Sequence, residues 1–196
     1  MRGLIAFVLS LLVASAVLAA NSLDASVILK KIQERGPRHS AKELWDSSSR
    51  WVELIKNVES GKKQWLEVAK ALRPGTDAGA SEMLGLATGV ALLRSPREVL
   101  LLLAPVMGID AICGFPDTSD DRYKTQKLTL QYLDARISTV KSLVGAEIAG
   151  LKDQCLEQLN RTKAQVLSPS GPFSANSGSN PSIESGSLTA CAHLKR

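Results

Sequence analysis

Histidine is nearly absent from this chain, which contains only His39 and His193 among its 196 residues. We expect His39 to lie in a loop after Gly36-Pro37, and His193 to lie in a polar C-terminal tail. The spacings H-E-x-x-H and G-x-S-x-G and the phosphate-binding P-loop do not occur. A hydrolytic triad would need the fold to bring a serine next to His39, and no sequence motif marks such a serine. The sequence therefore favours a protein without catalytic activity.

Cysteine and aromatic residues are also scarce. The three cysteines, at positions 113, 155 and 191, show no C-x-x-C spacing, which excludes the usual zinc and thiol redox motifs. The net charge is +5, and the basic pairs Lys30-Lys31 and Lys62-Lys63 are not interleaved with aromatics. Nucleic-acid binding requires a clustered basic patch. We predict no cofactor, no metal and no nucleic-acid partner.

The first twenty residues have the three-part composition of a secretory leader. Arg2 provides a positive charge, residues 4–13 are apolar, and small residues dominate positions 14–20. Cleavage is expected within residues 16–20, and an uncleaved membrane anchor is the alternative. After removal of the leader we expect a periplasmic or secreted protein without stable membrane insertion.

Helical periodicity dominates the rest of the chain, and there is no strand-like alternation or Asn-Gly hairpin signal. Capping boxes predict helix starts at Ser40 and Ser95, and the turn containing Asp77 is expected to cap a helix. The run from 99 to 104 is apolar throughout, which predicts a helix buried on all sides. The predicted helices cover 22–35, 40–60, 62–73, 81–93, 96–107, 120–144 and 146–166.

Short connections favour antiparallel packing of consecutive helices. We therefore predict an all-α fold, either a helical bundle or a short HEAT-like superhelix of antiparallel helix pairs. The predicted divisions are a signal peptide at 1–20, an N-terminal helix and linker at 21–39, a helical domain at 40–166 and a disordered tail at 167–196. The tail is rich in Ser, Gly, Asn and Pro, and has too few apolar residues to form a core.

Acidic residues gather between 117 and 121, in a segment predicted as a loop over 109–119. They lack the spacing of a calcium-binding EF-hand loop. We interpret them as the start of a helix, with Thr118 or Ser119 as its cap. As an alternative function, these acids with Glu82 and Asp110 could supply the carboxylate pair of a hydrolase.

A disulfide between Cys113 and Cys155 is expected from their predicted positions. Cys113 follows the apolar helix 96–107, and Cys155 lies on the apolar face of the last helix, so both should approach the core. Cys191 lies in the tail, and its fate stays open. The alternative is a pair of buried free thiols, which pack as small apolar groups.

Tryptophans and one inter-helix turn are the candidate contacts for a partner. Trp51 and Trp65 fall on apolar stripes and are predicted to be core residues, whereas Trp45 is offset and should be partly exposed. The turn from Arg73 to Gly79 should present backbone groups at the surface. The predicted binding residues are Trp45, Arg73, Thr76 and Asp77.

The stretch from 44 to 159 contains a series of short motifs: Trp65-Leu66 with Ala69 and Leu72, Arg73-Pro74-Gly75-Thr76-Asp77-Ala78-Gly79, Ser81-Glu82-Met83-Leu84, Ser95-Pro96 with Val99-Leu100, Cys113 and Cys155-Leu156. With these motifs the stretch resembles a family of small exported bacterial proteins with no assigned activity. The resemblance implies an all-α periplasmic domain with one disulfide, and it brings no catalytic residues. We predict a helical binding or interaction protein whose partner is another envelope protein. An immunity-type protein that masks a toxin is one concrete form of this role, and an envelope hydrolase is the alternative.

Overall fold

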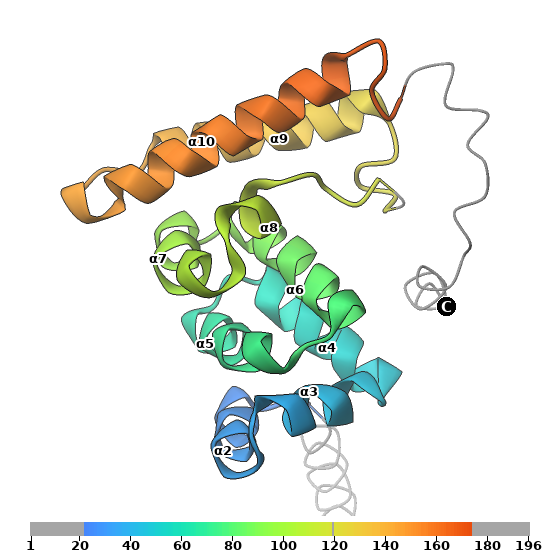
Figure 1. The fold of residues 1–196 in the computed structure, drawn as a ribbon, viewed down its shortest axis with the longest axis vertical. Helices are drawn as coiled ribbons and strands as arrows, with labels where there is room; N and C mark the ends of the chain where they lie inside the picture. Colours follow the sequence, from blue (N-terminus) through green and yellow to red (C-terminus); the bar gives the residue numbers. More distant parts are fainter. Residues whose placement is uncertain (1–21, 119, 174–196) are drawn as a thin grey trace, which may run out of the picture.

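The computed structural model describes residues 22–118 and 120–173, and every regular element within them is helical (Figure 1). The predicted all-α class is confirmed. The predicted leader at 1–20, and Cys191 and His193 in the tail, lie outside the described residues. The helices are α2 Ala25–Arg35, α3 Pro37–Trp45, α4 Ser48–Glu59, α5 Lys63–Leu72, the 3-10 turn η1 Arg73–Gly75, α6 Ala78–Ala91, α7 Pro96–Met107, α8 Ile109–Cys113, α9 Gln126–Lys141 and α10 Ala146–Leu167.

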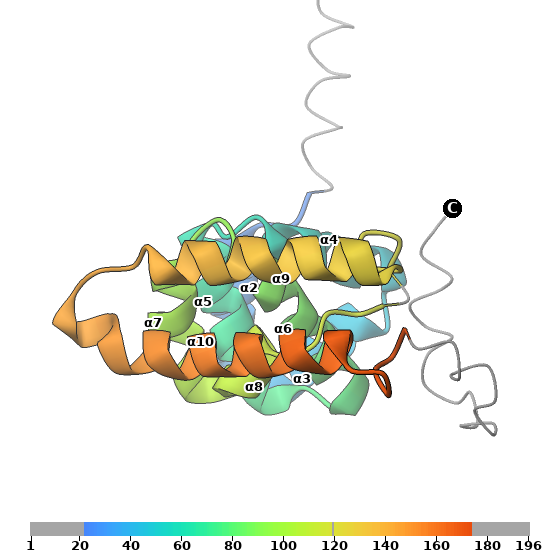
Figure 2. The same ribbon diagram turned by 90° about the horizontal axis from the view of Figure 1, so that it is seen from above.

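Helix pairs are stacked in layers along the molecule (Figure 1). The pair α2 and α3 forms one end, α4 with α5 and α6 with α7 follow, and α9 with α10 forms the other end. The main contacts join neighbouring layers: α5 packs against α2 and α7, α4 packs against α6, and α10 covers α7 and α8. Figure 2 shows α9 and α10 lying side by side over the other helices. This stacking has the form of a short superhelix of helix pairs.

A continuous apolar core passes through these layers. Leu54 in α4, Leu66 in α5, Leu84 in α6, Leu100 in α7 and Leu159 in α10 are all completely buried. Full burial of one leucine side chain contributes about 1.5–3 kcal/mol. The layers are therefore held together mainly by the apolar faces that the helical periodicity predicted.

The chain passes from α2 into α3 without a linker. Gly36 has φ of 82°, in the left-handed region, and Pro37 occupies the first helical position of α3. Ser40 is consequently buried inside α3, and its hydroxyl donates to the Gly36 carbonyl at 3.0 Å. The predicted capping box at Ser40 is wrong, and residues 37–39 belong to a helix. The single helix predicted over 40–60 is divided into α3 and α4.

Two other helices begin close to their predicted starts, although α6 begins at Ala78, three residues before the predicted residue 81. The Asp77 carboxylate accepts the backbone N–H of Ala80 at 3.0 Å and caps α6. Helix α7 begins at Pro96, but Ser95 makes no side-chain capping bond. The position of the second capping box is therefore right, and its hydrogen-bonding mechanism is wrong.

The segment after α7 departs most from the expected structure. Gly108, with φ of 84°, ends α7, and the short helix α8 occupies part of the predicted loop. Helix α9 begins only after Thr125, whose hydroxyl accepts the backbone N–H of Leu128 at 3.3 Å. The predicted cap at Thr118 or Ser119 is therefore wrong, and Ser119 itself lies outside the described residues.

Helix α7 is buried on one face rather than on all sides. Val99, Leu100 and Leu103 are completely buried, whereas Leu101 is 37% exposed and Val106 is 38% exposed. The prediction of all-round burial is wrong at these two outer positions. Within residues 22–118 and 120–173, no helix combines the length and the apolarity needed to cross a lipid bilayer.

Candidate functional site

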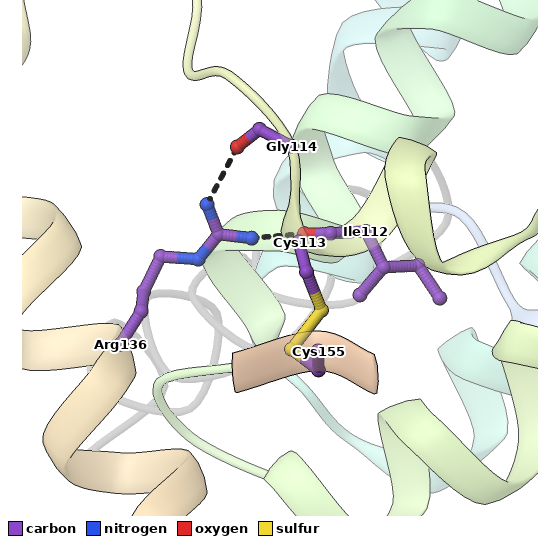
Figure 3. Close-up of a disulfide and its surroundings, with 5 residues drawn as sticks. All are labelled: Ile112, Cys113, Gly114, Arg136 and Cys155. Carbon is purple, nitrogen blue, oxygen red and sulfur yellow. Dashed lines mark hydrogen bonds between the residues drawn. A yellow bond between two sulfur atoms is a disulfide. The ribbon is translucent and has the colours of Figure 1, made fainter. Parts of the chain in front are cut away.

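A disulfide joins α8 to α10 (Figure 3). The Cα atoms of Cys113 and Cys155 are 5.5 Å apart, and both residues are completely buried. The predicted pairing is confirmed, and the alternative of two free thiols is wrong. The bond ties the outer helix pair α9–α10 to the layer beneath it.

Arg136 of α9 lies beside this disulfide and was not predicted as a site residue. Its guanidinium donates to the backbone carbonyls of Ile112 and Gly114, on either side of Cys113 (Figure 3). The bond to Gly114 measures 3.1 Å. The last carbonyls of a helix lack partners within the helix and attract a cation. Arg136 therefore completes the hydrogen bonding at the end of α8.

The charge of Arg136 is buried among neutral groups. The residue is 1% exposed, its Cζ lies 5.2 Å from the centre of the Tyr132 ring, and its Nε has no hydrogen-bond partner. Burial lowers the pKa of Arg136, because removal from water disfavours the charged form. A charged residue between Leu133 and Ile137 on an apolar helix face was the signal in the sequence. Because the guanidinium is enclosed, its role is to hold α8 rather than to bind a ligand.

The structure brings Trp45 and the predicted turn together, although they are far apart in the sequence. Trp45 is half-buried and packs edge-on against Trp51, with ring centres 5.2 Å apart. A Cβ placed on Gly79 would lie 3.4 Å from the Trp45 ring, so the ring covers the start of α6. Trp51 and Trp65 are buried as predicted. We use the name Trp45–turn surface for Trp45, Arg73, Thr76, Asp77, Ala78 and Gly79.

Internal hydrogen bonds fix the shape of this turn. The Arg73 guanidinium donates to the hydroxyls of Thr76, at 3.3 Å, and Ser81, at 2.5 Å. The Thr76 hydroxyl donates to the Arg73 carbonyl at 2.9 Å, and Asp77 caps α6. One terminal nitrogen of Arg73 and the Thr76 hydroxyl thus order the turn, whereas the buried Nε of Arg73 has no hydrogen-bond partner. Its exposed residues are Pro74, Asp77 and Ala78, the last of which begins α6.

The acids proposed for a carboxylate pair are distributed over separate elements. Glu82 on α6 and Asp110 on α8 are exposed, and Asp117 follows α8. Asp110 lines a cavity of about 440 Å³ between α8 and α10, together with Glu157 and Arg161, which pair with each other at 2.8 Å. Neither Glu82 nor Asp117 lines this cavity. Across the described part of the chain, no three His, Cys, Asp or Glu side chains gather in a metal-binding group.

The acidic segment before α9 forms ion pairs instead of capping the helix. Asp120 binds the side chain of Arg122 at 2.7 Å, and Asp121 lies 3.5 Å from Lys124. Arg122 also binds Glu59 of α4 at 3.0 Å. These contacts attach the segment before α9 to the α4–α5 layer.

Fold and covalent structure together define a domain of stacked helix pairs that is closed by one disulfide. No protein-family model, curated protein or solved structure matches this chain. Function is therefore inferred from the surfaces and side-chain environments of the described residues.

Proposed function

We propose that the protein is an exported helical binding protein without catalytic activity, and that its partner is another protein of the cell envelope. The observation that carries this proposal is the Trp45–turn surface. A half-buried tryptophan lies there beside an ordered turn whose residues Pro74, Asp77 and Ala78 are exposed. Tryptophan is enriched among the residues that dominate binding energy, and a preordered turn loses little entropy on binding.

The disulfide supports the compartment that we propose. Disulfides persist in oxidising compartments, and the buried Cys113–Cys155 bond is compatible with an exported protein. We further propose the periplasm, and membership of the family of small exported bacterial proteins, on the motifs around the Arg73–Gly79 turn. An immunity-type protein that masks a toxin would fit this role.

A cross-linking experiment tests the proposed function. A photoreactive amino acid at Asp77 of the full chain should cross-link to one saturable partner in an envelope extract. The variant Ala78→Arg should abolish this product, because a long charged side chain would stand on the surface. The matched control is Ala149→Arg on α10, since both alanines are exposed.

The alternative hydrolase predicts a different result. It predicts cleavage of a cell-wall or peptide substrate by the purified protein, with loss of cleavage in Asp110→Asn or Glu82→Gln. Such cleavage, together with no saturable cross-link at Asp77, would contradict the binding function.

A further inference from the structure

Glu43 on α3 is surrounded by cationic side chains from three helices. Lys31 of α2 donates a hydrogen bond to its carboxylate. Arg35 of α2 lies 3.9 Å away, His39 of α3 lies 4.0 Å away, and Arg50 of α4 lies 3.7 Å away. We use the name Glu43 cluster for these five residues. The sequence alone does not reveal this cluster, because its members come together only when α2, α3 and α4 pack.

The Glu43 cluster carries more positive than negative charge. Three cations, Lys31, Arg35 and Arg50, face one carboxylate, so the formal charge of the cluster is +2 without the histidine. The surrounding cations, chiefly the hydrogen bond from Lys31, hold the pKa of Glu43 below its usual value. At 3.9 and 3.7 Å, the two guanidinium groups lie beyond hydrogen-bond distance of Glu43 and retain donors for another acceptor.

The cluster adjoins the Trp45–turn surface. Glu43 and Trp45, the central residues of the two, lie on α3, which is nine residues long and therefore spans only about 13 Å. The exposed residues Arg38, His39 and Lys42 lie on the outer side of α3, between Glu43 and Trp45 in helical rotation. One partner could therefore contact the cluster and the tryptophan at the same time.

We propose that the Glu43 cluster binds the carboxylates of an acidic segment on the partner protein. This inference rests on the proposed function and adds the chemistry of the partner. Arginine pairs with carboxylates in a bidentate geometry, and complementary charge steers encounter and selects partners.

A protein segment fits better than a nucleic acid or a lipid surface. Glu43 lies at the centre of the cluster. Two further acids are close in the chain: Glu34 is in α2, and Asp46 directly follows α3. A continuous row of phosphates would meet these acids, whereas a short segment with a few carboxylates can avoid them. Trp45 adds an apolar contact that suits a polypeptide side chain.

The test uses the full chain and a synthetic peptide of six glutamates, with binding followed by the amide NMR signals. We expect the signals of α2, α3 and the start of α4 to shift, and the affinity to fall as salt is raised. The double variant Arg35→Gln/Arg50→Gln should weaken binding by at least about tenfold. Arg161→Gln on α10 is the matched control, and Arg50→Lys should retain part of the affinity. The dispersion of the amide signals reports folding of each variant.

Two outcomes would overturn the inference. One is unchanged peptide affinity in the folded double variant. The other is binding of duplex DNA or of phosphatidylglycerol vesicles at the same amides without binding of the peptide. If the cross-link at Asp77 persists while the peptide fails to bind, the cluster is rejected and the proposed function stands. If the cross-link is absent while the peptide binds at the cluster, the proposed function fails.

Discussion

Arg136 shows how one residue can combine a large energetic cost with a structural gain. Moving a guanidinium out of water costs several kcal/mol, and among the described residues its partners are two carbonyls and an aromatic ring. A hydrogen bond from a charged donor returns about 1.5–3 kcal/mol. Removing the arginine would leave the buried carbonyls of Ile112 and Gly114 without these donors. The balance between these terms can be measured.

The first prediction concerns Arg136→Met. We expect it to lower the free energy of unfolding by about 2–4 kcal/mol, because two buried carbonyls lose their partners. Urea unfolding followed by circular dichroism measures the change. Arg161→Met, on the exposed side of α10, should change stability by less than about 0.5 kcal/mol. A stability of Arg136→Met equal to or above that of the wild type would contradict this, because it would show that the cost of burying the charge cancels or exceeds the gain from its hydrogen bonds.

Tyr123 and Tyr132 give a prediction for alkaline pH. Their ring centres are 4.2 Å apart, and burial is the main reason that the pKa of each phenol is raised. A raised pKa means that the folded state holds its proton longer than the unfolded state. Stability is therefore complete below about pH 10 and declines as the pH rises above that value. Urea unfolding between about pH 8 and pH 11 should show this decline.

The control for the alkaline decline is Tyr132→Phe, which removes one titrating group. The slope of unfolding free energy against pH should become shallower in this variant. An identical slope in both proteins would assign the decline to lysines, which titrate in the same range.

At the scale of elements, the sequence predicted helices whose ends depend on neighbouring residues. It did not predict a helix that depends on contacts with residues far along the chain. Helix α6 begins after Asp77, where a carboxylate three residues before a backbone N–H is a sufficient signal. The short helix α8 depends on a bond to Cys155 and on Arg136, both remote in the sequence. At Ser40 a local signal was misleading: the capping pattern predicted a helix start there, but Gly36 and Pro37 start α3 three residues earlier.

Gly75 gives a prediction about the packing of η1 against α3. A Cβ at this position would lie 2.2 Å from the backbone nitrogen of Arg38 and 2.2 Å from the carbonyl carbon of Pro37. Gly75→Ala must therefore move one backbone away from the other, and we expect a loss of about 3 kcal/mol in thermal or urea unfolding. In contrast, Gly150 of α10 has open space, and Gly150→Ala should stabilise the helix by about 0.5–1 kcal/mol. Equal effects of the two substitutions would refute the close approach.

The disulfide gives a second prediction for the elements. It closes a segment with a sequence separation of 42 residues. In a Cys191→Ser background, which prevents exchange, Cys113→Ala/Cys155→Ala should lose about 4 kcal/mol by the chain-entropy argument. Urea unfolding of the oxidised protein provides the reference, and the same measurement after reduction should give a similar loss. A loss below about 1 kcal/mol would indicate that packing and Arg136 hold α8 against α10 without the bond.

At the scale of the whole molecule, the stack of layers explains which parts of the binding surface were predictable. Trp45 and the Arg73–Gly79 turn could each be recognised as exposed features of helices and turns. Their contact depends on the packing of α3 against η1 and the start of α6, and the Glu43 cluster depends on the packing of three helices. Periodicity identifies which face of a helix is buried, but it does not identify the helix that covers it.

The stack also changes the role of the N-terminal helix, which was predicted to lie outside the helical domain. Ile28 and Ile32 of α2 belong to the common core, and the backbone N–H of Leu23 donates to Glu53 of α4 at 2.8 Å. We expect a variant that begins at Ser40 to lose at least about 5 kcal/mol, because it removes two buried isoleucines and exposes the faces that they cover.

This loss is comparable to the whole stability of a typical domain, which is about 5–15 kcal/mol. The variant that begins at Ser40 should therefore show collapsed amide NMR dispersion and no cooperative urea transition. A variant that begins at Ser22 keeps α2 and should unfold like the full chain. Cooperative unfolding of the shorter variant at the same urea concentration would place α2 outside the cooperative unit. Lys31 and Arg35 of the Glu43 cluster lie in α2. That result would therefore mean that part of the cluster lies outside the cooperatively folded unit.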